Sequence, residues 1–103
     1  MYLKVLPGHG LQLEDRDNFR SFKLVVEARR DQIADICRIL ADTAELPNHE
    51  TAWVFETALR KWPGVEFDDE WQQSLTVMID KARPHGWIDD TRKAIKAHVE
   101  WLA

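Results

Sequence analysis

The four histidines are the side chains of this sequence best suited to acid–base or metal chemistry, and they are scattered along the chain. They are His9, His49, His85 and His98. His49-Glu50 is not followed by a second histidine four positions after the first, so the spacing of a zinc protease is absent. Because Cys37 is the only cysteine, no Cys/His cluster can complete a closed zinc site. We therefore expect no metal site.

The paired carboxylates, the serines and the glycine-rich turn do not form a catalytic set either. Asp68-Asp69 and Asp89-Asp90 fall where helix caps and turns need carboxylates, whereas catalytic acid pairs need two different environments. Pro7-Gly8-His9-Gly10 is too short for a phosphate loop and is explained by a turn. Ser21 and Ser74 lie in no nucleophile-elbow motif. The sequence therefore predicts no catalytic residue and no cofactor.

The distribution of charge points to the C-terminal end as a binding surface. The formal net charge of −4 argues against a general polyanion binder. Residues 1–80 hold nine Lys/Arg against fifteen Asp/Glu, whereas residues 81–103 hold five against three. Any attraction for an anionic partner should therefore lie near the C-terminus. The candidate interaction surface comprises Lys81, Arg83, His85, Trp87, Arg92, Lys93, Lys96 and His98.

Pro84-His85-Gly86-Trp87 has two interpretations. The functional one is a corner in which a titratable ring lies beside an aromatic plate. The structural one, which we favour, is that Gly86 ends a helix, Pro84 prevents its continuation and Trp87 anchors the following strand in the core.

Length and composition are those of a small globular domain. A chain of 103 residues, with 45% apolar and 31% charged residues, predicts one domain spanning 1–103. Five tryptophans are expected to lie mainly in the core, and any outside it could anchor a partner. They are Trp53, Trp62, Trp71, Trp87 and Trp101. A single cysteine, no membrane-length apolar run and no signal-peptide layout favour a cytoplasmic protein without a membrane segment.

The first third of the chain predicts two strands. Tyr2 to Leu6 is strand-like and ends at the Pro7–Gly10 turn, and residues 12–20 are expected to form a surface loop. Residues 22–28 alternate, with Phe22, Leu24, Val26 and Ala28 on one face, which predicts a second strand. A wide hairpin could join the two strands.

The middle of the chain predicts three helices. The first is capped by Asp31, ends near Leu46 and places Cys37 on its buried stripe. The second covers residues 52–62, although residues 52–54 could instead be an extended bridge. The third is capped by Asp68 and ends near Arg83, before a proline.

The last segment alternates between apolar and polar residues, which favours a strand. Ile95, Ala97, Val99 and Trp101 share one side, and Lys96, His98 and Glu100 share the other. We predict a hairpin in which Trp87-Ile88 is the partner strand and residues 89–92 form the turn. The alternative is a fourth helix capped by Asp90, packed on the others, since residues 93–97 have high helix propensity.

The fold class expected is α+β: N-terminal strands, three helices and a C-terminal β-hairpin. From residue 31 onward, the order of helix, extended piece, two helices and hairpin resembles a winged helix domain. The resemblance rests on element order alone and implies that the third helix and the hairpin face a partner. In DNA-binding winged helices that helix enters the major groove, but here it begins with Glu66-Phe67-Asp68-Asp69-Glu70, whose carboxylates would repel phosphate.

Three functions remain open at this point. The one we favour is a small non-catalytic protein-interaction or adaptor module that binds another protein or itself. The second is a winged-helix-type DNA-binding regulator. The third is a small-ligand-binding protein or an enzyme whose site is assembled from residues distant in sequence.

Overall fold

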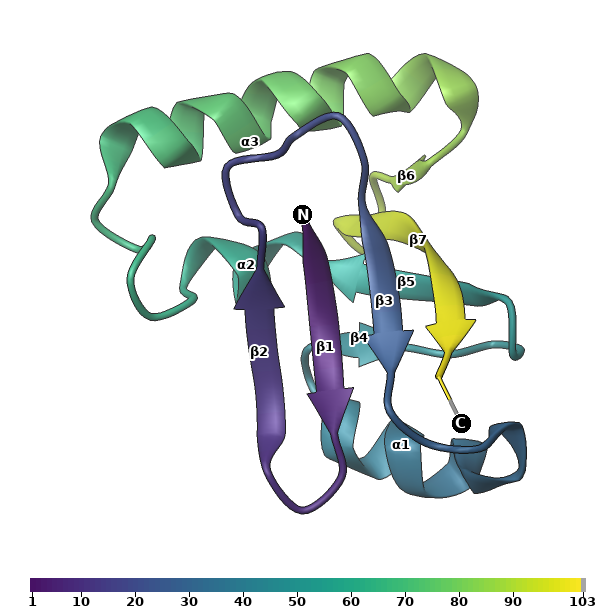
Figure 1. Cartoon of the computed structure of the whole chain (residues 1–103). Coiled ribbons are helices and arrows are strands. Elements are labelled where there is room, and N and C mark those ends of the chain that lie inside the picture. The colour runs from purple at the N-terminus through teal and green to yellow at the C-terminus, as the bar shows by residue number, and fades with distance from the viewer. Residues whose placement is uncertain (103) are drawn as a thin grey trace.

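The computed structural model describes residues 1–102 as a curled seven-stranded sheet with three α-helices and two short 3-10 helices (Figure 1). The predicted α+β class is therefore confirmed, although strands make up more of the fold than expected. The sheet has the order β2-β1-β3-β7-β5-β4, and β6 pairs separately with β7. None of the helices in residues 1–102 combines the length and the hydrophobicity needed to span a bilayer.

The N-terminal strands pair differently from the prediction. β1 (Tyr2–Leu6) forms a hairpin with β2 (Gly10–Glu14), so the loop expected over residues 12–20 begins with a strand. β3 (Lys23–Val26) is a strand, as predicted, but it runs parallel to β1. The wide hairpin was wrong because β2 already reverses the chain, and residues 15–22 then cross over the start of β1, so that β3 runs parallel to β1 along its other edge (Figure 1).

The C-terminal hairpin is confirmed, with its first strand and its turn one residue later than predicted, and the alternative fourth helix is wrong. β6 (Ile88–Asp89) pairs antiparallel with β7 (Ala94–Trp101). β7 also pairs antiparallel with β5 (Thr51–Phe55) and parallel with β3. It is therefore a central strand rather than a free wing, and the winged-helix-like order is not confirmed. The short strand β4 (Ala44–Glu45) completes the sheet beside β5.

The first two helices are shorter than predicted. η1 (Arg30–Gln32) leads into α1 (Ile33–Leu40), and Asp31 lies in the first turn instead of capping it. α1 ends at Ala41, which has a positive φ, so residues 44–45 can form β4. Cys37 is exposed rather than buried, because Ile36 and Leu40 form the inward stripe. Residues 52–54 are extended within β5, which confirms the alternative, and α2 covers only Glu56–Arg60.

The third helix, α3 (Asp69–Ala82), agrees closely with the prediction. The Asp68 carboxylate accepts a 3.1 Å hydrogen bond from the Trp71 backbone N–H, which caps the helix. At the other end, η2 (Arg83–His85) is followed by Gly86 in the left-handed conformation. Glycine adopts this conformation readily because it has no Cβ, and it commonly ends helices for that reason.

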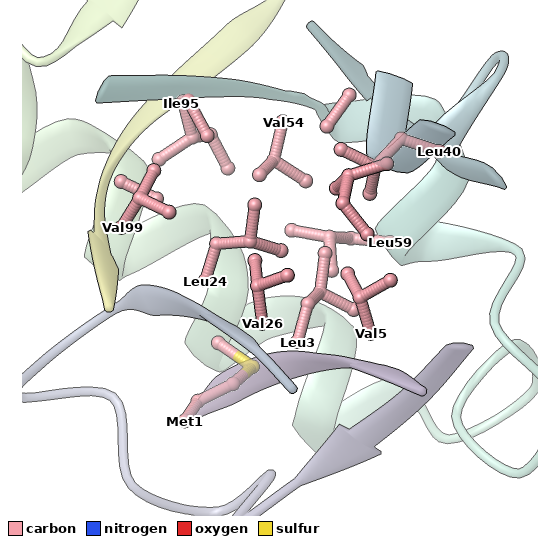
Figure 2. Close-up of a cluster of buried hydrophobic side chains, with 14 of the residues drawn as sticks. Met1, Leu3, Val5, Leu24, Val26, Leu40, Val54, Leu59, Ile95 and Val99 are labelled. Carbon is pink, nitrogen blue, oxygen red and sulfur yellow. The ribbon is translucent and has the colours of Figure 1, made fainter. Parts of the chain in front are cut away.

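The core lies on the concave side of the sheet (Figure 2). Leu3, Val5, Leu24, Val26, Val54, Ile95 and Val99 converge there from β1, β3, β5 and β7. The buried face of α3, with Trp71, Leu75 and Ile79, belongs to the same cluster. Trp71 is the one buried tryptophan of the residues described, whereas Trp87 is 48% exposed. The expected role of Trp87 as a core anchor was therefore wrong.

Candidate binding site

A groove of about 750 Å³ lies between the C-terminal end of α3 and the sheet. We call it the α3–β7 groove. It is lined by segments 19–22, 50–51 and 95–98, and by Met78, Lys81, Ala82, His85 and Trp87. Its apolar lining includes buried Ile95 and Ala97 together with half-buried Phe22 and Met78. The volume is within the range of small-molecule sites.

The groove lies where the sheet is split beside β7. On the side of β7 away from β5, β6 pairs with Ala94 and Ile95, and β3 pairs from His98 onward. In residues 1–102 no strand is registered on that side at Lys96 and Ala97. The two partner strands therefore leave an opening between them, which the end of α3 borders.

The loop over residues 15–22 forms one wall of the groove, and contacts with Met1 and Trp71 hold it in position. The Met1 ammonium donates to the backbone carbonyls of Asn18 at 2.8 Å and Ser21 at 3.1 Å. Burial lowers the pKa of this ammonium group from its ordinary value. The Trp71 indole N–H donates to the Arg16 carbonyl at 2.9 Å, and the Phe19 and Trp71 ring centroids are 5.6 Å apart. These contacts fix the wall at both of its ends.

An aromatic stack also lines the groove. The His85 and Trp87 rings are stacked, with centroids 4.4 Å apart and an interplanar angle of 19°. Two hydrogen bonds hold the backbone of Trp87 in place. Its carbonyl accepts from the backbone N–H of Lys96 at 2.8 Å, and its N–H donates to the carbonyl of Ala82 at 3.4 Å. The indole is thus positioned by the backbone while its ring stays half-exposed.

Three cations surround the groove without an acidic partner. Arg20, Lys81 and Lys96 are exposed, and none forms an ion pair with any carboxylate of residues 1–102. The carboxylate on the groove lining is Glu50, which is already paired with Arg30 at 3.1 Å. The groove is therefore electropositive in a protein whose net charge is −4.

The remaining predicted residues lie outside the groove and are largely neutralised. Arg83 pairs with Asp80 at 2.8 Å and with Asp90 at 3.1 Å. Its hydrogen bond with Asp90, and to a lesser extent that with Asp80, raises the pKa of the guanidinium. Arg92 pairs with Asp89 at 2.8 Å and with Glu45.

Arg92 and Lys93 belong to the hairpin turn rather than to the groove. The Arg92 guanidinium lies 5.7 Å from the Trp53 ring centroid, and its hydrogen bond lowers the pKa of Asp89. Lys93 lines a separate, smaller hollow together with Arg92. These two side chains therefore do not contribute to the α3–β7 groove.

Five of the eight predicted surface residues meet at the groove. They are Lys81, His85, Trp87, Lys96 and His98. Sequence reasoning missed Arg20, Phe22 and Thr51, which reach the groove from the N-terminal half of the chain. No local pattern marks them, because they join the groove only through the pairing of β3 and β5 with β7.

The arrangement suits binding of an anionic group attached to an apolar one. In residues 1–102 no group of three His, Cys, Asp or Glu side chains is placed to hold a metal ion. His85 and His98 make no side-chain hydrogen bond with a carboxylate of the residues described, so neither has the orienting partner of a catalytic base. No family model, curated protein or solved structure matches the chain. The groove itself is therefore the basis for a functional assignment.

Proposed function

We propose that this protein is a non-catalytic binding module whose α3–β7 groove holds a segment of a protein partner. The segment would carry carboxylates beside an aromatic or large aliphatic side chain. One observation supports this most directly: Arg20, Lys81 and Lys96 surround an apolar lining and have no acidic partner among residues 1–102.

The absence of partners is informative because ion pairing is the rule elsewhere on this surface. Eight of the fourteen Lys/Arg side chains form ion pairs within residues 1–102. Three of the other six lie together at one groove. Complementary charge accelerates encounter and selects the partner, while a desolvated aromatic anchor supplies most of the binding energy. The half-exposed Trp87 provides such an anchor.

A short fluorescein-labelled peptide with one phenylalanine flanked by carboxylates is the direct probe. We expect it to shift the Trp87 indole and Lys96 amide resonances of the protein. Lys96→Glu should raise the dissociation constant of the peptide at least about tenfold, because the new carboxylate would repel the carboxylates of the peptide. Lys93→Glu is the matched control, since it changes the same charge three positions away and outside the groove.

Two results would contradict the proposal. One is the absence of any resonance shift at millimolar peptide. The other is equal binding of a peptide in which lysines replace the carboxylates, because an electropositive groove must discriminate between the two.

A small aromatic carboxylate is the second candidate ligand. The groove volume of about 750 Å³ and the lining by His85 and Trp87 favour it. A free aromatic carboxylate that competes with the peptide at equal concentration would favour a small-ligand role. A peptide that binds at least about tenfold more tightly favours a protein partner.

Binding to DNA is the weakest alternative. The start of α3 carries Glu66, Asp68, Asp69 and Glu70, and none of these forms an ion pair within residues 1–102 that would mask its charge. Phosphate contacts impose a steep salt dependence, so titration of random duplex at low salt would detect them. We expect no binding.

A further inference from the structure

The chain itself carries a segment with the chemistry that the groove would accept. Glu66, Phe67, Asp68, Asp69 and Glu70 are all exposed, and Phe67 is 90% exposed. Among residues 1–102, no cation pairs with any of the four carboxylates. We call residues 66–70 the acidic segment. It presents one aromatic ring among four negative charges.

The acidic segment is held in one conformation before any partner arrives. Val65, immediately before it, is fully buried, and the Asp68 N–H donates to the Val65 carbonyl at 3.1 Å. Asp68 in turn caps α3. A ligand that is already ordered loses less conformational entropy on binding. Phe67 is thus presented at a fixed position, although it contributes nothing to the core.

The acidic segment lies at the N-terminal end of α3 and the groove at its C-terminal end. Figure 1 shows these two ends on opposite sides of the molecule. The helix has 14 residues, which corresponds to a length of about 21 Å. One molecule therefore cannot place its own acidic segment in its own groove. The contact must be made between two molecules.

On the basis of the proposed function, we infer that the groove binds the acidic segment of a second copy of this chain. Phe67 of one copy packs against the His85–Trp87 stack of the next, and the neighbouring carboxylates face Arg20, Lys81 and Lys96. The two surfaces are different, so each copy can offer its acidic segment to one neighbour and its groove to the same or another neighbour. Such contacts form open chains or closed rings, and the smallest ring is a two-fold dimer in which each acidic segment occupies the groove of the other copy.

Sedimentation velocity of the full chain over a range from about 10 μM to about 1 mM tests this inference. We expect the weight-average sedimentation coefficient to rise with concentration at low salt. The rise should disappear at about 0.5 M NaCl, because exposed charges are screened there. Phe67→Ala and Lys96→Glu should each abolish the rise. Leu102→Ala and Lys93→Glu, which alter an exposed apolar side chain and a cation outside the contact, should leave it unchanged.

Mixing the two inactive variants tests whether the groove of one copy binds the acidic segment of another. Phe67→Ala retains a working groove, and Lys96→Glu retains a working acidic segment. An equimolar mixture should therefore form a dimer that cannot extend, although each variant alone stays monomeric. Superimposable thermal unfolding curves of both variants and the unaltered protein would show that they are folded.

Three results would overturn the inference: a monomer at every concentration, association that survives Phe67→Ala, or a mixture that stays monomeric. If the labelled acidic peptide still binds the groove in those cases, the binding module remains and only its occupant is wrong. If the peptide fails as well, the proposed function falls with the inference.

Discussion

The tryptophans near the two ends of α3 differ in their exposure to solvent. Near the N-terminal end, Trp71 is 3% exposed, contacts Phe19 and donates its indole N–H to the Arg16 carbonyl. Just beyond the C-terminal end, Trp87 is 48% exposed and stacks on His85. The same residue type thus joins the core at one end and remains available for binding at the other.

The cations near the C-terminal end of α3 likewise fall into two groups. Arg83 of η2 and Arg92 of the hairpin turn are paired with carboxylates, whereas Lys81 and Lys96 at the groove are not. A neutralised cation holds elements of the fold together, and an unpaired one can attract a ligand. The comparison therefore separates residues that stabilise the fold from those proposed to bind.

The largest difference should be between the two tryptophans themselves. Trp71→Ala should lower the free energy of unfolding by about 3–5 kcal/mol, because it empties a large buried volume and leaves the Arg16 carbonyl without its donor. Trp87→Ala should lower it by about 1 kcal/mol or less, as for other exposed sites. Urea unfolding followed by far-ultraviolet circular dichroism measures both. Equal losses would contradict the distinction.

Gly86 should show how strongly the end of α3 positions the aromatic stack. Its φ of +77° disfavours any residue with a Cβ, although a Cβ there would meet no atom within 4 Å. Gly86→Ala should therefore lower the free energy of unfolding by about 1–2 kcal/mol through backbone strain alone. Gly86→Asn is the control, since asparagine tolerates the left-handed region and should lose less. Thermal unfolding measures both variants. A higher unfolding temperature for Gly86→Ala than for Gly86→Asn would contradict the left-handed conformation assigned to this position.

The N-terminal cap should have an intermediate effect. Asp68→Ala removes the acceptor for the Trp71 N–H and should destabilise the protein by about 1 kcal/mol. Asp69→Ala, its neighbour in the first turn, makes no capping hydrogen bond and should cost less. Chemical unfolding of the pair isolates the hydrogen bond from the charge. A larger loss of stability for Asp69→Ala than for Asp68→Ala would show that Asp68 is not the capping residue.

The smallest effect should come from the hairpin turn. The Arg92 hydrogen bond lowers the pKa of Asp89, so the ionised carboxylate is favoured in the folded state. This contribution is present above the ordinary aspartate pKa of about 3.9 and is lost as the pH falls through the folded-state pKa. Arg92→Gln should raise the pKa of Asp89 toward its ordinary value. Carbon-13 titration of the Asp89 carboxyl group detects the shift, and an unchanged midpoint would refute the assigned cause.

Regions with local signals were predicted well. The cap at Asp68, the apolar stripe of α3 and the alternation from Ile95 to Trp101 all correspond to elements of the structure. β2 was missed because Gln12 and Glu14 gave it the polarity of a loop, and Gly10–Glu14 is paired along one side alone, with β1. α1 was overextended because Ala41 and Ala44 continue a helical pattern that the chain abandons to form β4.

The candidate site was predicted in part. The charge asymmetry identified the C-terminal cations, but it could not distinguish Lys96 from Arg92, since pairing depends on carboxylates such as Glu45 that are distant in sequence. Arg20 and Phe22 gave no signal, because only the register of β3 against β7 brings their loop to the groove.

By itself, the sequence determined the elements whose signals are local: the third helix with its cap, the final strand and the charge of each segment. Tertiary structure decided the strand order, the exposure of Trp87 and the existence of the groove. The physical reason is the range of the interactions. Helix caps and apolar periodicity act within a few residues, whereas pairings such as Lys23 with His98 are fixed only when distant strands close around one core.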